Sequence, residues 1–146
     1  MAIREIRTTG DPILNKVSKE IKEITPNIIQ LLDDMNDTMQ AANGAGIAAV
    51  QIGALRRAIL VVSSEDTILE LINPVLIESK DENIDTEGCL SVPGQTGEVA
   101  RPLYVKVEGL DRYGKKVVYE ATDRVAVAFC HELDHLDGIL YTDKLV

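Results

Sequence analysis

The chain contains only two histidines, His131 and His135, and both lie in one short stretch near the C-terminus. Residues four positions apart on an α-helix lie only about 40° apart around its axis, so both imidazoles can reach one divalent metal ion. Glu132 follows the first histidine directly. In the pattern H-E-x-x-H the glutamate usually does not bind the metal, but handles the proton of a water on it. The spacing therefore favours a hydrolytic metal site over a helix whose charges are merely solvated.

A metal held in this way needs a third protein ligand. In one group of metalloproteases this ligand is a histidine six residues after the second motif histidine, but Tyr141 occupies that position here. Other groups use a glutamate from a later helix, and no glutamate follows His135. Asp137 and Asp143 are the only acidic residues downstream. We therefore expect the third ligand to lie upstream.

The two cysteines are the upstream candidates. Cys130 adjoins His131 and points about 100° away from it around a helix, which is a poor position for sharing its metal. A lone cysteine is more often a small buried apolar residue than a ligand. Here, however, a metal pair lacks its third partner, and Cys89 is the remaining thiol. The sequence therefore predicts a site made of Cys89, His131 and His135.

Length and composition restrict the class of protein. A chain of 146 residues has the size of one domain, so we expect residues 1–146 to form a single catalytic domain. Aromatic residues are only 3% of the chain, so the core must consist of Ile, Val, Leu and Ala. The net charge of -9 leaves no basic excess to displace counterions from a phosphate backbone. Nucleic acid is therefore not an expected direct ligand.

The same sequence carries no membrane or export signal that we can identify. No stretch approaches eighteen apolar residues, and residues 1–10 contain no apolar signal-peptide segment. Two cysteines, one of them assigned to a metal, are typical of a reducing compartment. We expect no membrane span and a cytoplasmic location, and the family resemblance described below implies a bacterial cell.

The hydrophobic pattern predicts an α+β domain, in which mixed or antiparallel β-sheets pack around the central H-E-x-x-H helix. Residues 1–24 are expected to form an extended arm or loop. An additional N-terminal helix should begin with Thr25 as N-cap and Pro26 at its first position, and end at Asn43 and Gly44. Its apolar stripe consists of Ile28, Leu31, Leu32, Met35, Met39 and Ala42.

Short runs of branched residues predict the strands. They cover residues 57–62, 69–72, 75–78, 99–110 and 116–121, with Asn73 and Pro74 as a break. Residues 80–87 are expected to form a polar loop. The H-E-x-x-H helix should begin at Thr122 or Asp123 and end at Gly138.

The segment from Gly44 to Gln51 reads GAGIAAVQ. As a string it matches a dinucleotide-binding fingerprint, but that motif must follow a strand and open a helix, and this segment follows a helix. Two interpretations remain open. Either a peptide substrate lies along the segment, where glycines let another backbone come close, or the segment is a tight turn from helix to strand. Gln51 carries its only side-chain amide, which can donate a hydrogen bond to a developing oxyanion.

Three segments in this order resemble the peptide deformylases. Residues 44–51 resemble the family motif G-x-G-hydrophobic-A-A-x-Q, residues 87–91 match E-G-C-L-S, and residues 131–135 match H-E-x-D-H. Further short matches extend the resemblance over nearly the whole chain. The family's fold, with mixed sheets around the H-E-x-x-H helix, agrees with the hydrophobic pattern.

The resemblance implies hydrolysis of the formyl group from the N-formylmethionine of nascent polypeptides in bacteria or organelles. Cys89, His131 and His135 would hold the metal, and Glu132 would be the general acid and base for a metal-activated water. Two other groups, the Gln51 side chain and the backbone N–H of Leu90, would then stabilise the oxyanion.

The resemblance also implies a cofactor and a substrate pocket. The family usually uses Fe2+, one ion per chain, with Ni2+, Co2+ or Zn2+ as substitutes, although the ligand set alone would suit Zn2+. The peptide would lie extended along the first glycine motif and the segment after E-G-C-L-S, and its methionine would enter an apolar pocket. The residues implied are Gly44, Ala45, Gly46 and Leu90, with Val127 and Ala128 as pocket or ordinary core residues.

Three positions depart from the family pattern. Cys130 replaces a frequent glutamine, Val50 replaces a frequent proline or threonine, and the sequence ends at Val146 where many members continue into a further helix. A contact with the ribosome is therefore left open. Asp134 is either a solvated residue or a salt-bridge partner, with Arg101 as a candidate.

Two other function classes remain. A metallopeptidase would use the same metal and Glu132 to cleave peptide bonds. A non-catalytic metal-binding module would close the site with a fourth protein ligand.

Overall fold

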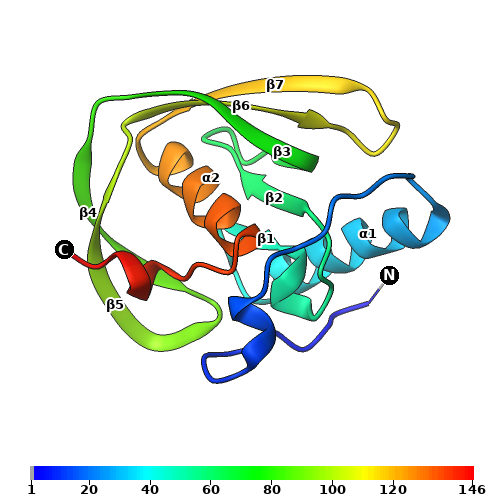
Figure 1. The fold of residues 1–146 in the computed structure, drawn as a ribbon, viewed down its shortest axis with the longest axis horizontal. Coiled ribbons are helices and arrows are strands. Elements are labelled where there is room, and N and C mark those ends of the chain that lie inside the picture. Colours follow the sequence, from blue (N-terminus) through cyan, green and yellow to red (C-terminus); the bar gives the residue numbers. More distant parts are fainter. Residues whose placement is uncertain (1) are drawn as a thin grey trace.

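The structure, a computed structural model, describes residues 2–146 (Figure 1). Two α-helices lie in this range, α1 (Pro26–Ala41) and α2 (Asp123–Leu136). The strands are β1 (Gly46–Ala48), β2 (Ala58–Val62), β3 (Ile68–Lys80), β4 (Asn83–Cys89), β5 (Val92–Arg101), β6 (Tyr104–Leu110) and β7 (Lys116–Thr122). Short 3-10 helices cover Pro12–Asn15, Ala49–Ile52 and Tyr141–Lys144.

The strands form two antiparallel sheets. One has five strands in the order β1-β2-β3-β6-β7, and the other consists of β4 and β5. Helix α2 lies between them and contacts strands of both, so that β3, β6 and β7 pass over one side of it and the β4–β5 hairpin over another (Figure 1). This arrangement confirms the predicted α+β fold around the H-E-x-x-H helix. No helix in the described range is long and apolar enough to cross a membrane.

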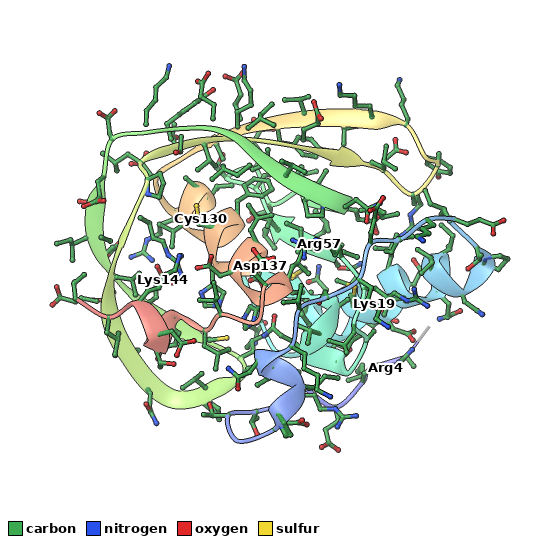
Figure 2. All side chains as sticks on the ribbon, viewed as in Figure 1. Arg4, Lys19, Arg57, Cys130, Asp137 and Lys144 are labelled. Atoms are coloured by element: carbon green, nitrogen blue, oxygen red, sulfur yellow. The ribbon has the colours of Figure 1, made fainter. Side chains whose placement is uncertain are left out.

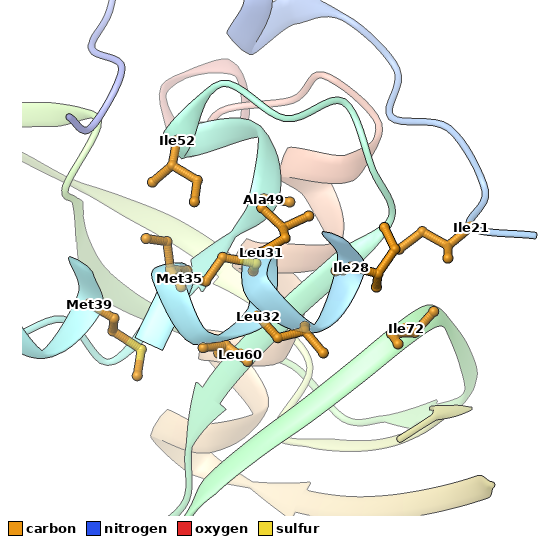
Figure 3. Close-up of a cluster of buried hydrophobic side chains, with 12 residues drawn as sticks. Ile21, Ile28, Leu31, Leu32, Met35, Met39, Ala49, Ile52, Leu60 and Ile72 are labelled. Atoms are coloured by element: carbon orange, nitrogen blue, oxygen red, sulfur yellow. The ribbon is translucent and has the colours of Figure 1, made fainter. Parts of the chain in front are cut away.

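Helix α1 begins where the sequence predicted. The Thr25 hydroxyl accepts a hydrogen bond from the N–H of Ile28, and Pro26 occupies the first turn, where its missing N–H costs nothing. The stripe of α1 packs against residues of β1, β2 and the 3-10 helix at 49–52, and Figure 3 shows Leu32, Met35 and Met39 within this cluster. The methionines are therefore core residues.

Helix α2 is held at its C-terminal end by groups from distant segments. The Arg57 guanidinium donates to the carbonyl of Leu136 at 3.1 Å and pairs with the Asp137 carboxylate at 3.0 Å, which neutralises the negative end of the helix (Figure 2). Gly138 follows with a φ of 75°, and a Cβ there would lie 2.6 Å from the carbonyl oxygen of Asn15. Only glycine fits this position, and the helix axis is therefore fixed relative to the N-terminal segment.

Three strand predictions were wrong. Asn73 and Pro74 do not break the chain into two strands, because Asn73 adopts a φ of 52° at a bulge and β3 continues through it. Its side chain exchanges two hydrogen bonds with the backbone of Ile21. Residues 80–87 are not a loop but mostly strand β4, and most of its polar side chains face solvent. The run 99–110 belongs to two strands in different sheets, separated near Pro102.

Candidate metal centre and active site

The structure brings Cys89, His131 and His135 together, as the sequence predicted. The ligand atoms of the three residues all lie within 4.8 Å of one another. The Cys89 sulfur lies 3.3 Å from Nε2 of His135, and the two imidazole centroids are 5.0 Å apart. The histidines come from one face of α2, and Cys89 comes from the end of β4, where the register to β5 shifts. No fourth metal-binding side chain joins this cluster within residues 2–146.

The chemistry of these three residues fits a divalent cation. His135 is fully buried, and burial lowers its pKa to about 3, so the ring is neutral as a ligand must be. Burial opposes a charge on His131, but the neighbouring Cys89 and Glu87 raise its pKa to about 10. The surroundings of His131 therefore favour a positive charge at this site, and a bound metal ion would supply that charge. This is a Cys-His-His metal site.

A buried ion pair behind His131 was missed by the sequence reasoning. Nδ1 of His131 lies 3.0 Å from Oε1 of Glu87, which directs Nε2 of the same ring toward the metal site. Arg101 donates two hydrogen bonds to Glu87, at 2.8 and 3.1 Å, and a third to Asp134. The possible pairing of Asp134 with Arg101 is thus confirmed. The signal that could have identified Glu87 was its place two residues before the predicted ligand Cys89, within the motif E-G-C-L-S.

Glu87 is held ionised although it is buried. Burial opposes its ionisation, but hydrogen bonds from His131 and Arg101 lower its pKa to about 2. A carboxylate on the outer nitrogen of a metal-binding imidazole fixes the ring orientation and raises its basicity. Glu87 therefore positions His131, and Arg101 positions Glu87.

The variant Glu87→Gln is expected to weaken metal binding about 10- to 100-fold. A neutral amide accepts a weaker hydrogen bond from His131 and leaves the buried Arg101 with only one of its two counter-charges, Asp134. Competition with a chelator of known affinity measures the change. The control is Glu98→Gln on the paired strand β5, because Glu98 is exposed and does not line the cavity beside the metal site. Equal metal affinity in E87Q and the unmodified protein would contradict this role.

Glu132 lies next to the metal site without joining its ligand set. The side chain is buried, and Oε1 has no hydrogen-bond partner within the described chain. Burial raises the pKa of this carboxyl to about 7, so it can both accept and release a proton near neutral pH. Gly46 makes room for it, because a Cβ there would lie 2.7 Å from Oε2 of Glu132.

Gln51 is oriented by hydrogen bonds at both ends of its amide. Oε1 accepts from the N–H of Ala48 at 2.9 Å, and Nε2 donates to Oγ of Ser91 at 3.1 Å. The same Nε2 lies 3.7 Å from the sulfur of Cys89. The amide donor is therefore held with its N–H groups toward the metal site. Ser91, its partner, was not singled out from the sequence.

A cavity of about 440 Å³ opens beside these groups. It is lined by the metal-site residues Cys89 and His131, but not by His135, and by all of the predicted catalytic and substrate-binding residues: Glu132, Gln51, Leu90, Gly44, Ala45, Gly46, Val127 and Ala128. Asp85, Thr86 and Arg124 also line it, although the sequence reasoning did not include them. Val127 and Ala128 are half-buried, so they contribute to the cavity wall as well as to the core.

Cys130 faces away from the metal site. It lines a different cavity together with Leu133, and burial raises the pKa of its thiol to about 11. It therefore stays a protonated thiol outside the ligand set, as its helical position predicted.

Three ligands of the Cys-His-His type, with a protonatable glutamate at an open cavity, define the class as a metallohydrolase. Comparisons with known proteins identify the family within this class. Residues 3–146 match the model of the family described as Polypeptide deformylase. The chain is 55% identical to the peptide deformylase of Acetivibrio thermocellus over 146 residues, which is all of this chain and 85% of that protein. It is also 55% identical to the peptide deformylase of Carboxydothermus hydrogenoformans over 144 residues, or 99% of this chain and 94% of that protein.

Solved structures agree with the sequence comparison. The class I type b peptide deformylase from Acinetobacter baumannii superposes with a TM-score of 0.95 at 33% identity, over 99% of this chain and all of that one. The enzyme from Ehrlichia chaffeensis, solved in complex with actinonin, gives 0.96 at 33% identity, over 100% of this chain and 90% of that one. The chain therefore belongs to the peptide deformylase family, and the resemblance in its three motifs is confirmed.

Proposed function

We propose that this chain removes the N-formyl group of nascent polypeptides in the 440 Å³ cavity beside the Cys-His-His site. Residues 1–146 would act as one catalytic domain. The observation that carries the assignment of the site is the convergence of its parts on one cavity: metal ligands, a buried protonatable glutamate and an oriented amide. The amide of Gln51 comes from the first family motif, the thiol of Cys89 from the second, and the two histidines and Glu132 from the third.

The metal would be held by the sulfur of Cys89 and by one ring nitrogen each of His131 and His135. When bound there, a divalent ion acts as a Lewis acid and lowers the pKa of a water in its open position. For its identity we propose Fe2+, one ion per chain, because the family usually uses it, with Ni2+, Co2+ or Zn2+ as substitutes.

Glu132 would move the protons. Its carboxylate form takes a proton from the attacking water, and the resulting carboxylic acid gives it to the departing amine. The unpartnered Oε1 and the raised pKa of about 7 support this role, because the group is neither locked in a salt bridge nor permanently charged.

Gln51 and the backbone N–H of Leu90 would stabilise the oxyanion that forms when the formyl carbon is attacked. Preorganised donors in a water-poor site are worth more than the same donors in water. The hydrogen bonds of Gln51 to Ala48 and Ser91 support its part, because they fix the amide before the substrate arrives.

The peptide would lie along Gly44, Ala45 and Gly46. A Cβ at Gly44 would come 2.9 Å from the Cδ1 atom of Leu90, so the absence of a side chain at Gly44 is what lets Leu90 lie this close to the segment. Val127 and Ala128 on α2 would contact the methionine side chain. The glycine segment was interpreted either as a path for the peptide or as a tight turn from helix to strand. Its place in the wall of the cavity favours the peptide path.

Formate release tests the proposed function. The purified protein should release formate from formyl-Met-Ala-Ser and leave unformylated Met-Ala-Ser intact. A metallopeptidase would cleave a peptide bond in either peptide. A non-catalytic metal-binding module would leave both peptides unchanged, and either result would contradict the proposal.

The metal assignment predicts sensitivity to oxygen. A ferrous ion beside a thiolate is readily oxidised, so protein purified without oxygen should lose activity in air, and catalase or a reductant should slow the loss. Metal analysis of the same sample should find one iron per chain. Protein reloaded with Ni2+ serves as the control and should keep its activity in air. If the anaerobically purified protein contains zinc and keeps its activity in air, the result would favour zinc.

A cytoplasmic location follows from the substrate, because nascent chains are made there. The net charge of -9 still disfavours direct binding of nucleic acid. A contact with the ribosome stays an open prediction.

A further inference from the structure

The N-terminal segment from Arg7 to Thr9 joins the two segments that surround the amide of Gln51. The N–H of Arg7 donates to the carbonyl of Gln51 at 2.7 Å, and the N–H of Thr9 donates to the carbonyl of Ser91 at 2.8 Å. In extended backbone, the N–H groups of residues two positions apart point to the same side. One edge of this short segment therefore connects two carbonyls that are 40 residues apart in the chain.

Thr9 makes a second bond to the same carbonyl. Its hydroxyl donates to the Ser91 oxygen at 3.0 Å. Ser91 is fully buried, its N–H donates to the sulfur of Cys89 at 3.4 Å, and its Oγ accepts from Nε2 of Gln51 at 3.1 Å. The residue that Thr9 holds is thus the one that touches both the thiolate and the amide donor.

These bonds form a closed ring. Starting at the side chain of Gln51, the ring runs through Ser91 to Thr9, along the backbone to Arg7, and back to the carbonyl of Gln51. Asp11 also fixes the segment, because its carboxylate pairs with the Arg7 guanidinium at 3.2 Å. Within residues 2–146, Gln51 and Ser91 are otherwise joined directly by a single hydrogen bond between their side chains.

We propose that Arg7 and Thr9 form a positioning element for the oxyanion donor, in which Thr9 acts through Ser91 on the amide of Gln51. The proposal rests on the oxyanion role of Gln51 stated above. An oxyanion donor has to be held within about 0.5 Å of its productive place, and a side-chain bond alone allows more movement than a closed ring. Thr9 does not reach the cavity, so it is a positioning residue and not a catalytic one.

The test compares Thr9→Val with Thr8→Val. Valine keeps the branched shape at either position, but only T9V removes a hydroxyl that donates to Ser91. We expect T9V to lower kcat for formyl-Met-Ala-Ser about fivefold, the factor for one neutral hydrogen bond, with KM and Tm unchanged. Both T8V and the conservative variant T9S should behave as the unmodified enzyme. Equal kcat in T9V and T8V would overturn the proposal.

A double-mutant cycle shows whether Thr9 acts through Gln51. In the background of Gln51→Ala, the change T9V should have no further effect on kcat, because the amide that Thr9 positions is already gone. If Q51A lowers kcat and T9V lowers it again by the same factor, the positioning proposal is overturned while the role of Gln51 stands. If Q51A leaves kcat unchanged, the oxyanion role of Gln51 itself fails.

Discussion

The variant Glu132→Gln is expected to lower kcat for formate release about 10²- to 10⁴-fold, the usual share of general acid and base catalysis. Glutamine has the same shape as glutamate but cannot take up the proton of water or give it to the amine. Glu132 is only 4% exposed, so a solvent molecule has poor access to take over its proton transfer. Release of formate from formyl-Met-Ala-Ser at saturating substrate measures the effect.

Metal content separates a catalytic loss from a structural one. Glu132 is not part of the ligand cluster, so E132Q should hold as much metal as the unmodified protein. Its KM should change little, because the peptide contacts other walls of the cavity. The matched control is Glu23→Gln, an exposed glutamate outside the active-site cavity, which should leave kcat unchanged. Full activity of metal-loaded E132Q would refute the assigned role.

The variant Cys89→Ala should remove the metal and, with it, nearly all activity. A structural zinc site gains about 10–16 kcal/mol from four ligands, so one ligand accounts for about 3–4 kcal/mol, or about 10²- to 10³-fold in affinity. The two imidazoles that remain on α2 can still bind a metal weakly. Dialysis against a chelator, followed by metal analysis, gives the affinity.

The second cysteine provides the control for C89A. Cys130 is the other free thiol of the described chain, but it faces a different cavity. Cys130→Ala should therefore keep its metal and its kcat, with at most a lower Tm from the buried volume that it loses. Loss of metal in both C89A and C130A would show that each thiol supports metal binding only through the stability of the fold. Retention of metal in C89A would show that the Cys89 sulfur is not a ligand.

Local sequence patterns determined the helical half of the site. His131, Glu132 and His135 follow from spacing on one helix, because the geometry of 3.6 residues per turn holds wherever that helix is placed. The start of α1 at Thr25 and Pro26 was equally local, since capping depends on neighbours only a few residues away. The amide chemistry of Gln51 suggested its proposed role, and the resemblance supported that role and added the one proposed for the Leu90 N–H; no periodicity indicates either.

Strand boundaries were less accessible to the sequence. The polar residues of β4 looked like a loop because the hairpin shows one face to solvent, and hydrogen bonds to β5 are what make it a strand. Asn73 and Pro74 looked like a break, yet the bonds between Asn73 and Ile21 hold β3 together across the bulge. In each case a partner far away in the chain decided the local conformation.

Only the tertiary structure decided how the site is assembled. Cys89 was reached by elimination, whereas its 3.3 Å approach to His135 depends on the β4–β5 hairpin folding over α2. The same holds for Glu87 behind His131. The ring through Thr9 and Ser91 likewise joins segments that no local pattern relates. A sequence displays the chemistry of each side chain and its helical or extended spacing, but contacts between distant segments arise only when the whole core packs. Here those contacts set the geometry of the three metal-site residues and of the Gln51 amide.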